Sequence, residues 1–209
     1  MLARSLGKNL ILATVVVLSI ASIAWATVDP LFIGVGARPL GMGKAYVAVA
    51  EDADTLFINP SGLGRIKSPK LTSMYSNLIG DVQYVLLGGV YPAGSLGAFG
   101  GGVVSTNVSN ILLFSDTFIS EGKATQGNHV FFLSYGVGLG QIFPSLNNIY
   151  FGANLKYFMQ GATGDSASLE AGNGTGIDMD LGLLYTPLSY LSFGLCAQDI
   201  LSKDMGGKV

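Results

Sequence analysis

The sequence contains few charged residues, one cysteine and one histidine. Charged residues make up 11% of its 209 positions. The single Cys196 excludes an intrachain disulfide and a cysteine-rich metal site. His129 has no second histidine or cysteine near it in the sequence, so it supports neither a metal site nor a Ser-His-Asp triad. We therefore predict no catalytic residues, no bound metal and no cofactor.

Two further absences narrow the class of protein. The formal net charge is −2 and no cluster of Lys and Arg occurs, which argues against a nucleic-acid partner. Although 49% of the residues are hydrophobic, no apolar run after position 30 is long enough for a membrane-spanning helix. Glycine is abundant instead, with 30 residues spread through the apolar segments. This mixture is typical of strands that face an apolar medium on one side and pack closely on the other.

The first 26 residues have the pattern of a cleaved secretory signal peptide. Arg4 and Lys8 precede an apolar stretch over 10–23, and Ala24-Trp25-Ala26 provides a small-x-small cleavage site. We expect residues 1–26 to be removed and the mature chain to begin near Thr27. The alternative is an uncleaved membrane anchor, because the apolar stretch is near the lower limit for spanning a bilayer.

The rest of the chain divides into two parts at about residue 68. Residues 27–68 are rich in Gly, Pro and Asp and show no sustained alternation, so we expect a compact irregular segment with a turn at Asn59-Pro60. Residues 69–209 show strand-length runs of alternating apolar and small or polar residues. The predicted strands are 70–79, 82–91, 95–107, 128–140, 148–160, 177–186 and 189–198.

The connections favour a barrel in the outer membrane over a soluble sandwich. Short turns at 92–94, 144–147 and 187–188 fall at one end of the predicted sheet, and long polar loops at 108–127 and 161–176 fall at the other. This asymmetry is typical of outer-membrane barrels, whose aromatic residues form girdles at the lipid boundary. The residues that we expect in one girdle are Tyr91, Phe143, Tyr150, Tyr185 and Tyr190. The sequence thus predicts an all-β, antiparallel up-and-down transmembrane β-barrel in contact with outer-membrane lipid.

Seven strands are an odd number, and the open edge of such a sheet cannot face hydrocarbon with unpaired backbone groups. We therefore expect 69–209 to be the first half of a barrel that further sequence completes, with assembly from several chains as the alternative. On adjacent strands, Lys156, Asp178 and Asp180 fall on the non-apolar faces, and hairpin register places Lys156 near Asp180. A charged constriction and a structural ion pair are both consistent with this placement, and the ion pair is favoured.

A family resemblance rests on residues 36–63. They read Gly36-Ala37-Arg38-Pro39-Leu40-Gly41-Met42-Gly43, then Ala45-Tyr46-Val47-Ala48-Val49-Ala50, Asp52-Ala53-Asp54, Leu56-Phe57 and Asn59-Pro60-Ser61-Gly62-Leu63. This stretch resembles the N-terminal signature of the PorV/PorQ family, within the FadL-like outer-membrane proteins. Lys44 stands where a glycine is usual and Ser61 where an alanine is usual.

The resemblance implies a barrel of about fourteen strands, with 27–68 inside the lumen as a plug or hatch. It also implies one of two functions, namely the passage of hydrophobic small molecules across the outer membrane or the binding of exported protein cargo in type IX secretion. A structural or adhesive surface barrel is a third hypothesis, and transport is the leading one. The candidate residues of the plug and lumen are Arg38, Glu51, Asp52, Asp54, Asn59, Lys156, Asp178 and Asp180. The signature residues are Gly36, Gly41, Met42, Gly43, Asn59 and Pro60.

Overall fold

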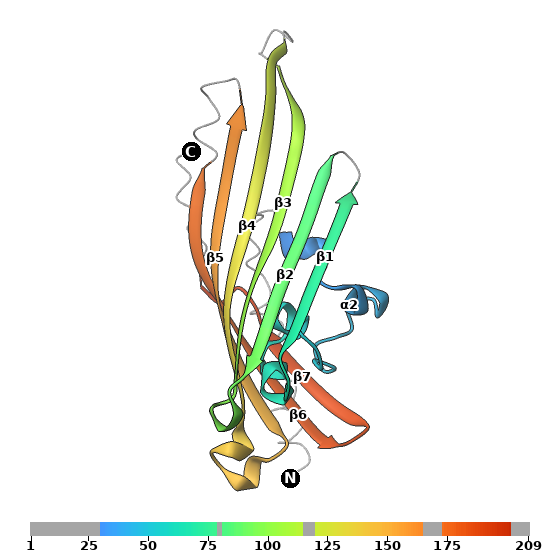
Figure 1. Ribbon diagram of the computed structural model, residues 1–209, viewed down its shortest axis with the longest axis vertical. Helices are drawn as coiled ribbons and strands as arrows, with labels where there is room; N and C mark the ends of the chain where they lie inside the picture. Colours follow the sequence, from blue (N-terminus) through green and yellow to red (C-terminus); the bar gives the residue numbers. More distant parts are fainter. Residues whose placement is uncertain (1–29, 79–80, 115–119, 165–172, 202–209) are drawn as a thin grey trace, which may run out of the picture.

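The protein folds into one antiparallel sheet of seven strands, each hydrogen-bonded to the next in chain order (Figure 1). The structure is a computed structural model that describes residues 30–78, 81–114, 120–164 and 173–201. The strands are β1 (Lys70–Leu78), β2 (Val82–Pro92), β3 (Ala98–Phe114), β4 (Ser120–Gly138), β5 (Ile149–Gly164), β6 (Gly174–Leu188) and β7 (Leu191–Ala197). The prediction of an all-β, antiparallel, up-and-down sheet is confirmed. Its expected signal peptide, residues 1–26, lies outside the described residues.

The expected long loops are wrong in length. β3 continues to Phe114 and β4 begins at Ser120, so most of 108–127 is strand, and β5 and β6 likewise take up part of 161–176. The polar residues Thr125 and Gln126 stay in the ladder because Thr163 and Ala162 pair with them. A backbone whose hydrogen bonds are satisfied tolerates polar side chains. The connection between β4 and β5 is longer than the expected turn, since it holds two 3-10 turns, η4 (Leu139–Gln141) and η5 (Pro144–Leu146).

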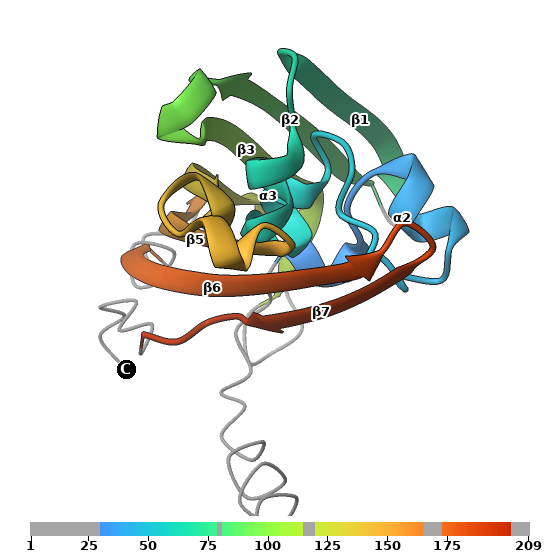
Figure 2. The ribbon, with the colours of Figure 1, turned by 90° about the horizontal axis from the view of Figure 1, so that it is seen from below.

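The sheet curls into a half-barrel with two different faces (Figure 2). Side chains alternate between the faces, as β-strand geometry requires. The inward face carries buried residues, among them Tyr84, Leu86, Val104, Val130, Phe132, Ser134, Asn154, Lys156, Phe158, Asp178, Asp180 and Leu184. The outward face carries exposed apolar residues, among them Leu71, Leu87, Phe99, Phe131, Leu133, Phe151, Leu155, Tyr157, Ile177, Leu183, Phe193 and Leu195.

One residue of the expected aromatic girdle, Tyr150, was placed on the wrong face of the sheet. Tyr150 pairs with the buried Leu184 and alternates with the exposed Phe151, so it lies on the inward face. Tyr91, Phe143, Tyr185 and Tyr190 are exposed.

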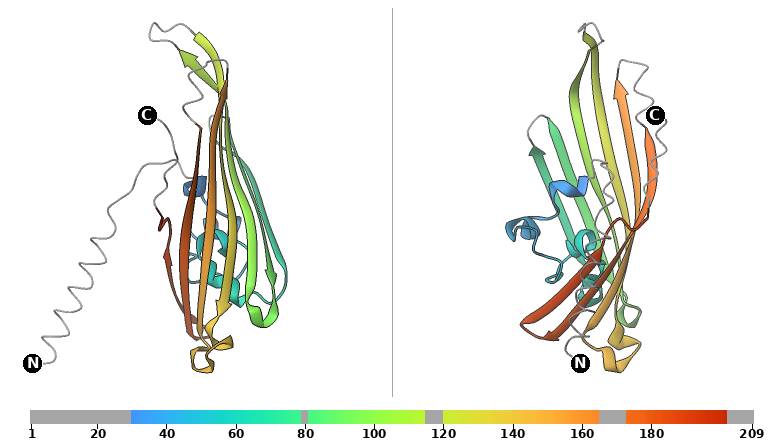
Figure 3. Two further views of the ribbon diagram at one scale, coloured as in Figure 1. Left: turned by 90° about the vertical axis from the view of Figure 1, so that its left-hand side faces the viewer. Right: turned by 180° about the vertical axis from the view of Figure 1, so that it is seen from behind.

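The N-terminal segment, residues 30–66, lies along the concave side of the sheet, with α2 (Ala37–Gly41) at its open side (Figure 3). It contains η1 (Pro30–Ile33), α2 (Ala37–Gly41), α3 (Thr55–Ile58) and η2 (Pro60–Arg65). We call the sheet β1–β7 the wall. Leu56, Phe57 and Leu63 are buried in one core with wall residues such as Phe132. The rings of Phe57 and Phe132 meet edge to face at 5.0 Å. Among the described residues, no helix is long and apolar enough to cross a membrane.

A set of inward-facing glycines explains how the segment approaches the wall. We call Gly88, Gly100, Gly102, Gly136, Gly152, Gly182 and Gly194 the glycine track. A Cβ atom at any of these positions would stand within 3.0 Å of an atom of the N-terminal segment. At Gly152, for example, it would lie 2.2 Å from the carbonyl carbon of Pro60. Glycine inside a strand often marks such a close backbone approach, so the wall is shaped to hold this segment.

Candidate functional site

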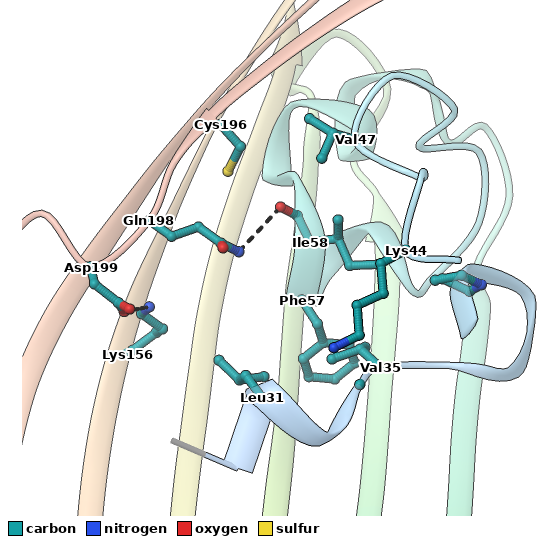
Figure 4. Close-up of a pocket in the computed structure, with 12 residues that line it drawn as sticks. Leu31, Val35, Lys44, Val47, Phe57, Ile58, Lys156, Cys196, Gln198 and Asp199 are labelled. Carbon is teal, nitrogen blue, oxygen red and sulfur yellow. Dashed lines mark hydrogen bonds and ion pairs between the residues drawn. The ribbon is translucent and has the colours of Figure 1, made fainter. Parts of the chain in front are cut away.

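A pocket separates part of the N-terminal segment from the wall (Figure 4). Its volume is ≈ 260 Å³. The lining residues are Leu31, Gly34, Val35, Pro39, Lys44, Val47, Phe57 and Ile58 from the segment, and Lys156, Cys196, Gln198 and Asp199 from the wall and the residues after β7. Most of this lining is apolar, with a few polar groups at the side of the wall. That composition is typical of small-molecule sites.

A buried ionic cluster forms the wall side of the pocket. Lys156, on β5, is 1% exposed, and its Nζ lies 2.6 Å from Oδ1 of Asp180 on β6. Asp178 is the cross-strand partner of Lys156, and Asp199 makes a second ion pair with its ammonium. The structure thus brings together Lys156, Asp178 and Asp180, which the sequence singled out. Because a buried charge is unfavourable without partners, the carboxylates are what allow a lysine to occupy this position.

Asp199 is the member of the cluster that the sequence did not reveal. Alternation along β7 places residue 199 on the outward face, together with Leu195 and Ala197. The strand ends at Ala197, however, and Asp199 has a φ of 55°, which turns the chain inward. No local sequence pattern predicts this turn. The one usable signal was that a buried lysine needs carboxylate partners, which made nearby acidic residues such as Asp199 candidates.

The residues after β7 form a short strap, defined here as Gln198–Leu201. The N–H of Asp199 donates to Oδ1 of Asp180 at 3.0 Å, and the N–H of Leu201 donates to Oδ1 of Asp178 at 2.9 Å. Nε2 of Gln198 donates to the carbonyl oxygen of Ile58 in α3 at 3.4 Å. The strap therefore connects the ionic cluster to the N-terminal segment, as Figure 4 shows for Gln198 and Ile58.

Asn154 makes a second connection between wall and segment. Its Nδ2 donates to the carbonyl oxygen of Leu56 at 2.9 Å and to Oδ2 of Asp180 at 3.1 Å. Asn154 and Lys156 are two positions apart on β5 and so share the inward face. A polar residue two positions from Lys156 in the same strand could therefore have been predicted to join the buried polar cluster.

The charged residues of the N-terminal segment separate into two groups. Arg38 donates to Glu51 at 3.1 Å and to Asp52 at 3.2 Å on the exposed side of the segment, and its hydrogen bond with Glu51 raises the pKa of Arg38. Tyr46 donates to Asp52, and burial is the larger cause of the raised pKa of the Tyr46 phenol, ahead of this hydrogen bond. None of these four residues lines the pocket.

Asp54 lies apart from Arg38. The Thr72 hydroxyl on β1 donates to Oδ1 of Asp54 at 2.5 Å, and burial raises the pKa of this carboxyl. A Cβ at Gly36, which has a φ of 70°, would stand 2.2 Å from Oδ2 of Asp54. Glycine at this position thus satisfies both the left-handed backbone and the space that Asp54 occupies.

The signature residues have unequal structural roles. Asn59 donates to the carbonyl oxygen of Val47 at 2.7 Å and accepts from the hydroxyl of Ser61 at 2.7 Å, while Pro60 begins η2. Gly43 has a φ of 62°, whereas Met42 is half exposed and a Cβ at Gly41 would meet nothing within 4 Å. The described contacts therefore explain Asn59, Pro60 and Gly43, but not Gly41.

Lys44 also has a left-handed backbone. Its φ is 66°, a conformation that glycine adopts readily and that is uncommon for other residues. At this position the resemblance predicts a glycine. The lysine instead places an ammonium-bearing side chain in the lining of the pocket.

Comparison with known proteins assigns no relative to the chain. No protein family, curated protein or solved structure matches it.

Proposed function

We propose that this chain forms part of an outer-membrane β-barrel that carries hydrophobic small molecules, with the N-terminal segment as its lumenal plug. One observation carries the proposal. Large apolar side chains cover the outward face of the sheet, while the charges of Lys156, Asp178 and Asp180 are buried on the inward face. A water-soluble sheet hides its apolar face, whereas a barrel wall in lipid exposes it.

The height of the apolar face matches a bilayer. On β5 the outward residues run from Ile149 to Met159 without a charged or strongly polar side chain. At a rise of about 3.3 Å per residue this run is about 33 Å long. A strand tilt of about 40° reduces that length to about 25 Å along the membrane normal, which is the height of the lipid-facing band in such barrels.

Polar and aromatic residues mark the two limits of this band. At one end, Met159 pairs with His129, whose Nδ1 is hydrogen-bonded to the Ser105 hydroxyl at 2.8 Å. Asn107 lies in the next outward row. At the other end, Tyr91 and Tyr185 are exposed. Aromatic and polar side chains at the edges of an apolar band are typical of the lipid boundary.

The strand directions limit how the barrel closes. All neighbouring strands are antiparallel, so the edge strands β1 and β7 run in the same direction. An antiparallel closure therefore needs an odd number of additional strands. Two copies related by an axis along the barrel would pair β7 with a parallel β1, so a second copy does not supply this closure.

The pocket supports hydrophobic solutes as cargo. It lies between the proposed plug and the wall, and most of its lining is apolar. A dry apolar cavity of about 150 Å³ is known to hold benzene, so a volume of ≈ 260 Å³ suits a somewhat larger apolar molecule. The resemblance to FadL-like proteins points to the same class of solute.

Tryptophan fluorescence in lipid tests the membrane placement. We expect Leu155→Trp, on the outward face, to be strongly quenched by brominated phospholipids, and Asn107→Trp, beyond the band, to be quenched much less. The only native tryptophan, Trp25, lies in the expected signal peptide. Equal quenching of the two variants would contradict the placement.

Uptake by cells tests the transport function. Deleting the gene should reduce uptake of a radiolabelled hydrophobic solute and leave uptake of a small sugar unchanged. Ile58→Trp fills the pocket and should reduce hydrophobic uptake as the deletion does. Leu195→Trp, on the outward face, serves as the matched control with normal uptake. Unchanged hydrophobic uptake in the deletion strain would refute transport.

The β3–β4 hairpin supports binding of exported protein cargo as a second candidate function. It extends beyond the neighbouring strands (Figure 1) and exposes Leu112 near its described end. Exposed apolar residues on a protruding hairpin are suited to a protein partner. Leu112→Ser should then lower the amount of cargo at the cell surface, and normal cargo levels would exclude this function.

A further inference from the structure

We propose that the strap, Gln198–Leu201, is a gate of the pocket and that the ion pair between Asp199 and Lys156 is its latch. The strap supplies Gln198 and Asp199 to the pocket lining, so its displacement enlarges the pocket on the wall side. The nature of the entering solute rests on the proposed function. The gate itself rests on the contacts of the strap.

The strap is held by polar contacts more than by packing. One backbone hydrogen bond, from the N–H of Ile200 to the carbonyl oxygen of Met179 at 3.0 Å, continues the ladder of β6. Ile200 and Leu201 are each 43% exposed, so they bury little apolar surface. A segment with few buried apolar contacts opens locally at low free energy. What keeps this one closed is its set of bonds to the ionic cluster.

Three of those bonds end on charged groups. Asp199 pairs with the ammonium of Lys156, its N–H donates to Asp180, and the N–H of Leu201 donates to Asp178. Hydrogen bonds to ionised groups are about twice as strong as neutral ones. Lys156 holds Asp180 and Asp199 side by side, since its ammonium pairs with both. Without that cation, three carboxylates would face one another at the end of the strap, and their repulsion would favour the open position.

Charged residues surround the latch on both sides of the pocket. Asp178 and Asp180 face Lys156 from β6, Asp199 faces it from the strap, and Lys44 lines the pocket from the N-terminal segment. Lys156 is the buried cation of this group. The latch is therefore an interaction between the wall and the strap.

The accessibility of Cys196 can be used to measure how often the gate opens. Cys196 is the single cysteine, it lines the pocket, and it lies two residues before the strap. Its side chain is partly buried while the strap is in place. Opening the strap should expose the thiol, so the rate at which a maleimide alkylates Cys196 measures the open population.

The experiment compares three forms of the mature chain in detergent, with alkylation followed by mass spectrometry. Asp199→Asn removes the charge of the latch with little change in shape, and we expect alkylation to accelerate about 10- to 100-fold, the factor of one lost hydrogen bond between charged groups. Asp81→Asn is the control, because Asp81 lies between β1 and β2, at the opposite edge of the sheet from β7 and the strap. It should react at the wild-type rate. Should Asp199→Asn also react at that rate, the latch is refuted.

Two further measurements separate the gate from the transport function. Asp199 is 41% exposed, so salt partly screens its pair with Lys156. Moderate salt should therefore accelerate alkylation of the wild type modestly and have less effect on Asp199→Asn, which lacks this charge. The apolar fluorescent probe N-phenyl-1-naphthylamine should bind the wild type and slow alkylation. If the probe does not bind but Asp199→Asn still reacts faster, the gate stands and the proposed solute class fails. If the probe binds and Asp199→Asn reacts normally, the gate fails alone.

Discussion

Gly152→Ala tests whether the glycine track holds the N-terminal segment against the wall. The added Cβ would stand 2.2 Å from the carbonyl carbon of Pro60 and 2.4 Å from the nitrogen of Ser61, whereas real Cβ atoms essentially never approach within 3.0 Å. Both neighbours are backbone atoms, so no side chain can rotate away. Overpacking of this kind typically destabilises by about 1–3 kcal/mol. Docking of the segment should therefore weaken by about 5- to 150-fold.

Limited proteolysis in detergent measures this docking. In Gly152→Ala we expect rapid cleavage within 30–66 under conditions that leave the wild-type segment intact, with the sheet still protected. Gly101→Ala is the matched control, because Gly101 lies in the same sheet on the outward face and the nearest atom to its Cβ would be 3.7 Å away. If the two variants are cleaved at the same rate, the close approach of segment and wall is not what stabilises the docking.

Three other predictions follow from the charged and strained residues. Burial raises the pKa of Asp54 above 3.8, so the folded state binds this proton more tightly than the unfolded state, and stability falls as pH rises from about 4 through the folded pKa. Asp54→Asn keeps an acceptor for Thr72 and should remove that fall, which urea unfolding at pH 4 and pH 7 would show as a smaller difference than in the wild type. Lys44→Gly relieves a left-handed backbone and should stabilise by about 1 kcal/mol, and an unchanged or lower melting temperature would contradict this. Lys156→Met leaves buried carboxylates without their cation and should cost about 3–5 kcal/mol, whereas Arg38→Met breaks exposed pairs and should cost less than about 1 kcal/mol in the same unfolding assay.

The strands were predictable because a period of two requires only local information. Alternation placed Phe131 and Leu133 on one face and Phe132 and Ser134 on the other, and the structure keeps that division. The same rule assigned Tyr150 to the face of Gly152. Grouping it with an outward girdle by its position in the chain was the error. The strand ends were missed, because polar residues such as Thr125 and Gln126 were taken as loop although they have paired partners.

The candidate site was predictable only where strand register was enough. Register places Lys156 opposite Asp178 and diagonal to Asp180 on the adjacent strand, which is close enough for the predicted ion pair with Asp180. The contribution of Asp199 depends on an inward turn after β7, and the pocket depends on how a segment without regular periodicity lies against the wall. Both are tertiary features. The sequence also could not show that Arg38 pairs with Glu51 and Asp52 while Asp54 bonds to Thr72. The three carboxylates are close together in the chain, so only the folded arrangement of the segment separates them.

The glycine track also has a consequence for the order of folding. The residues around Pro60 are synthesised before the sheet, yet their contacts lie on Gly136, Gly152 and Gly182, far along the chain. Such distant contacts form slowly, because a long loop must close before they stabilise anything. Until β4–β7 have paired, Leu56, Phe57 and Leu63 have only part of the core that buries them. The N-terminal segment is thus made before the sheet but is among the last parts to reach its final place, and it needs protection from aggregation in the meantime.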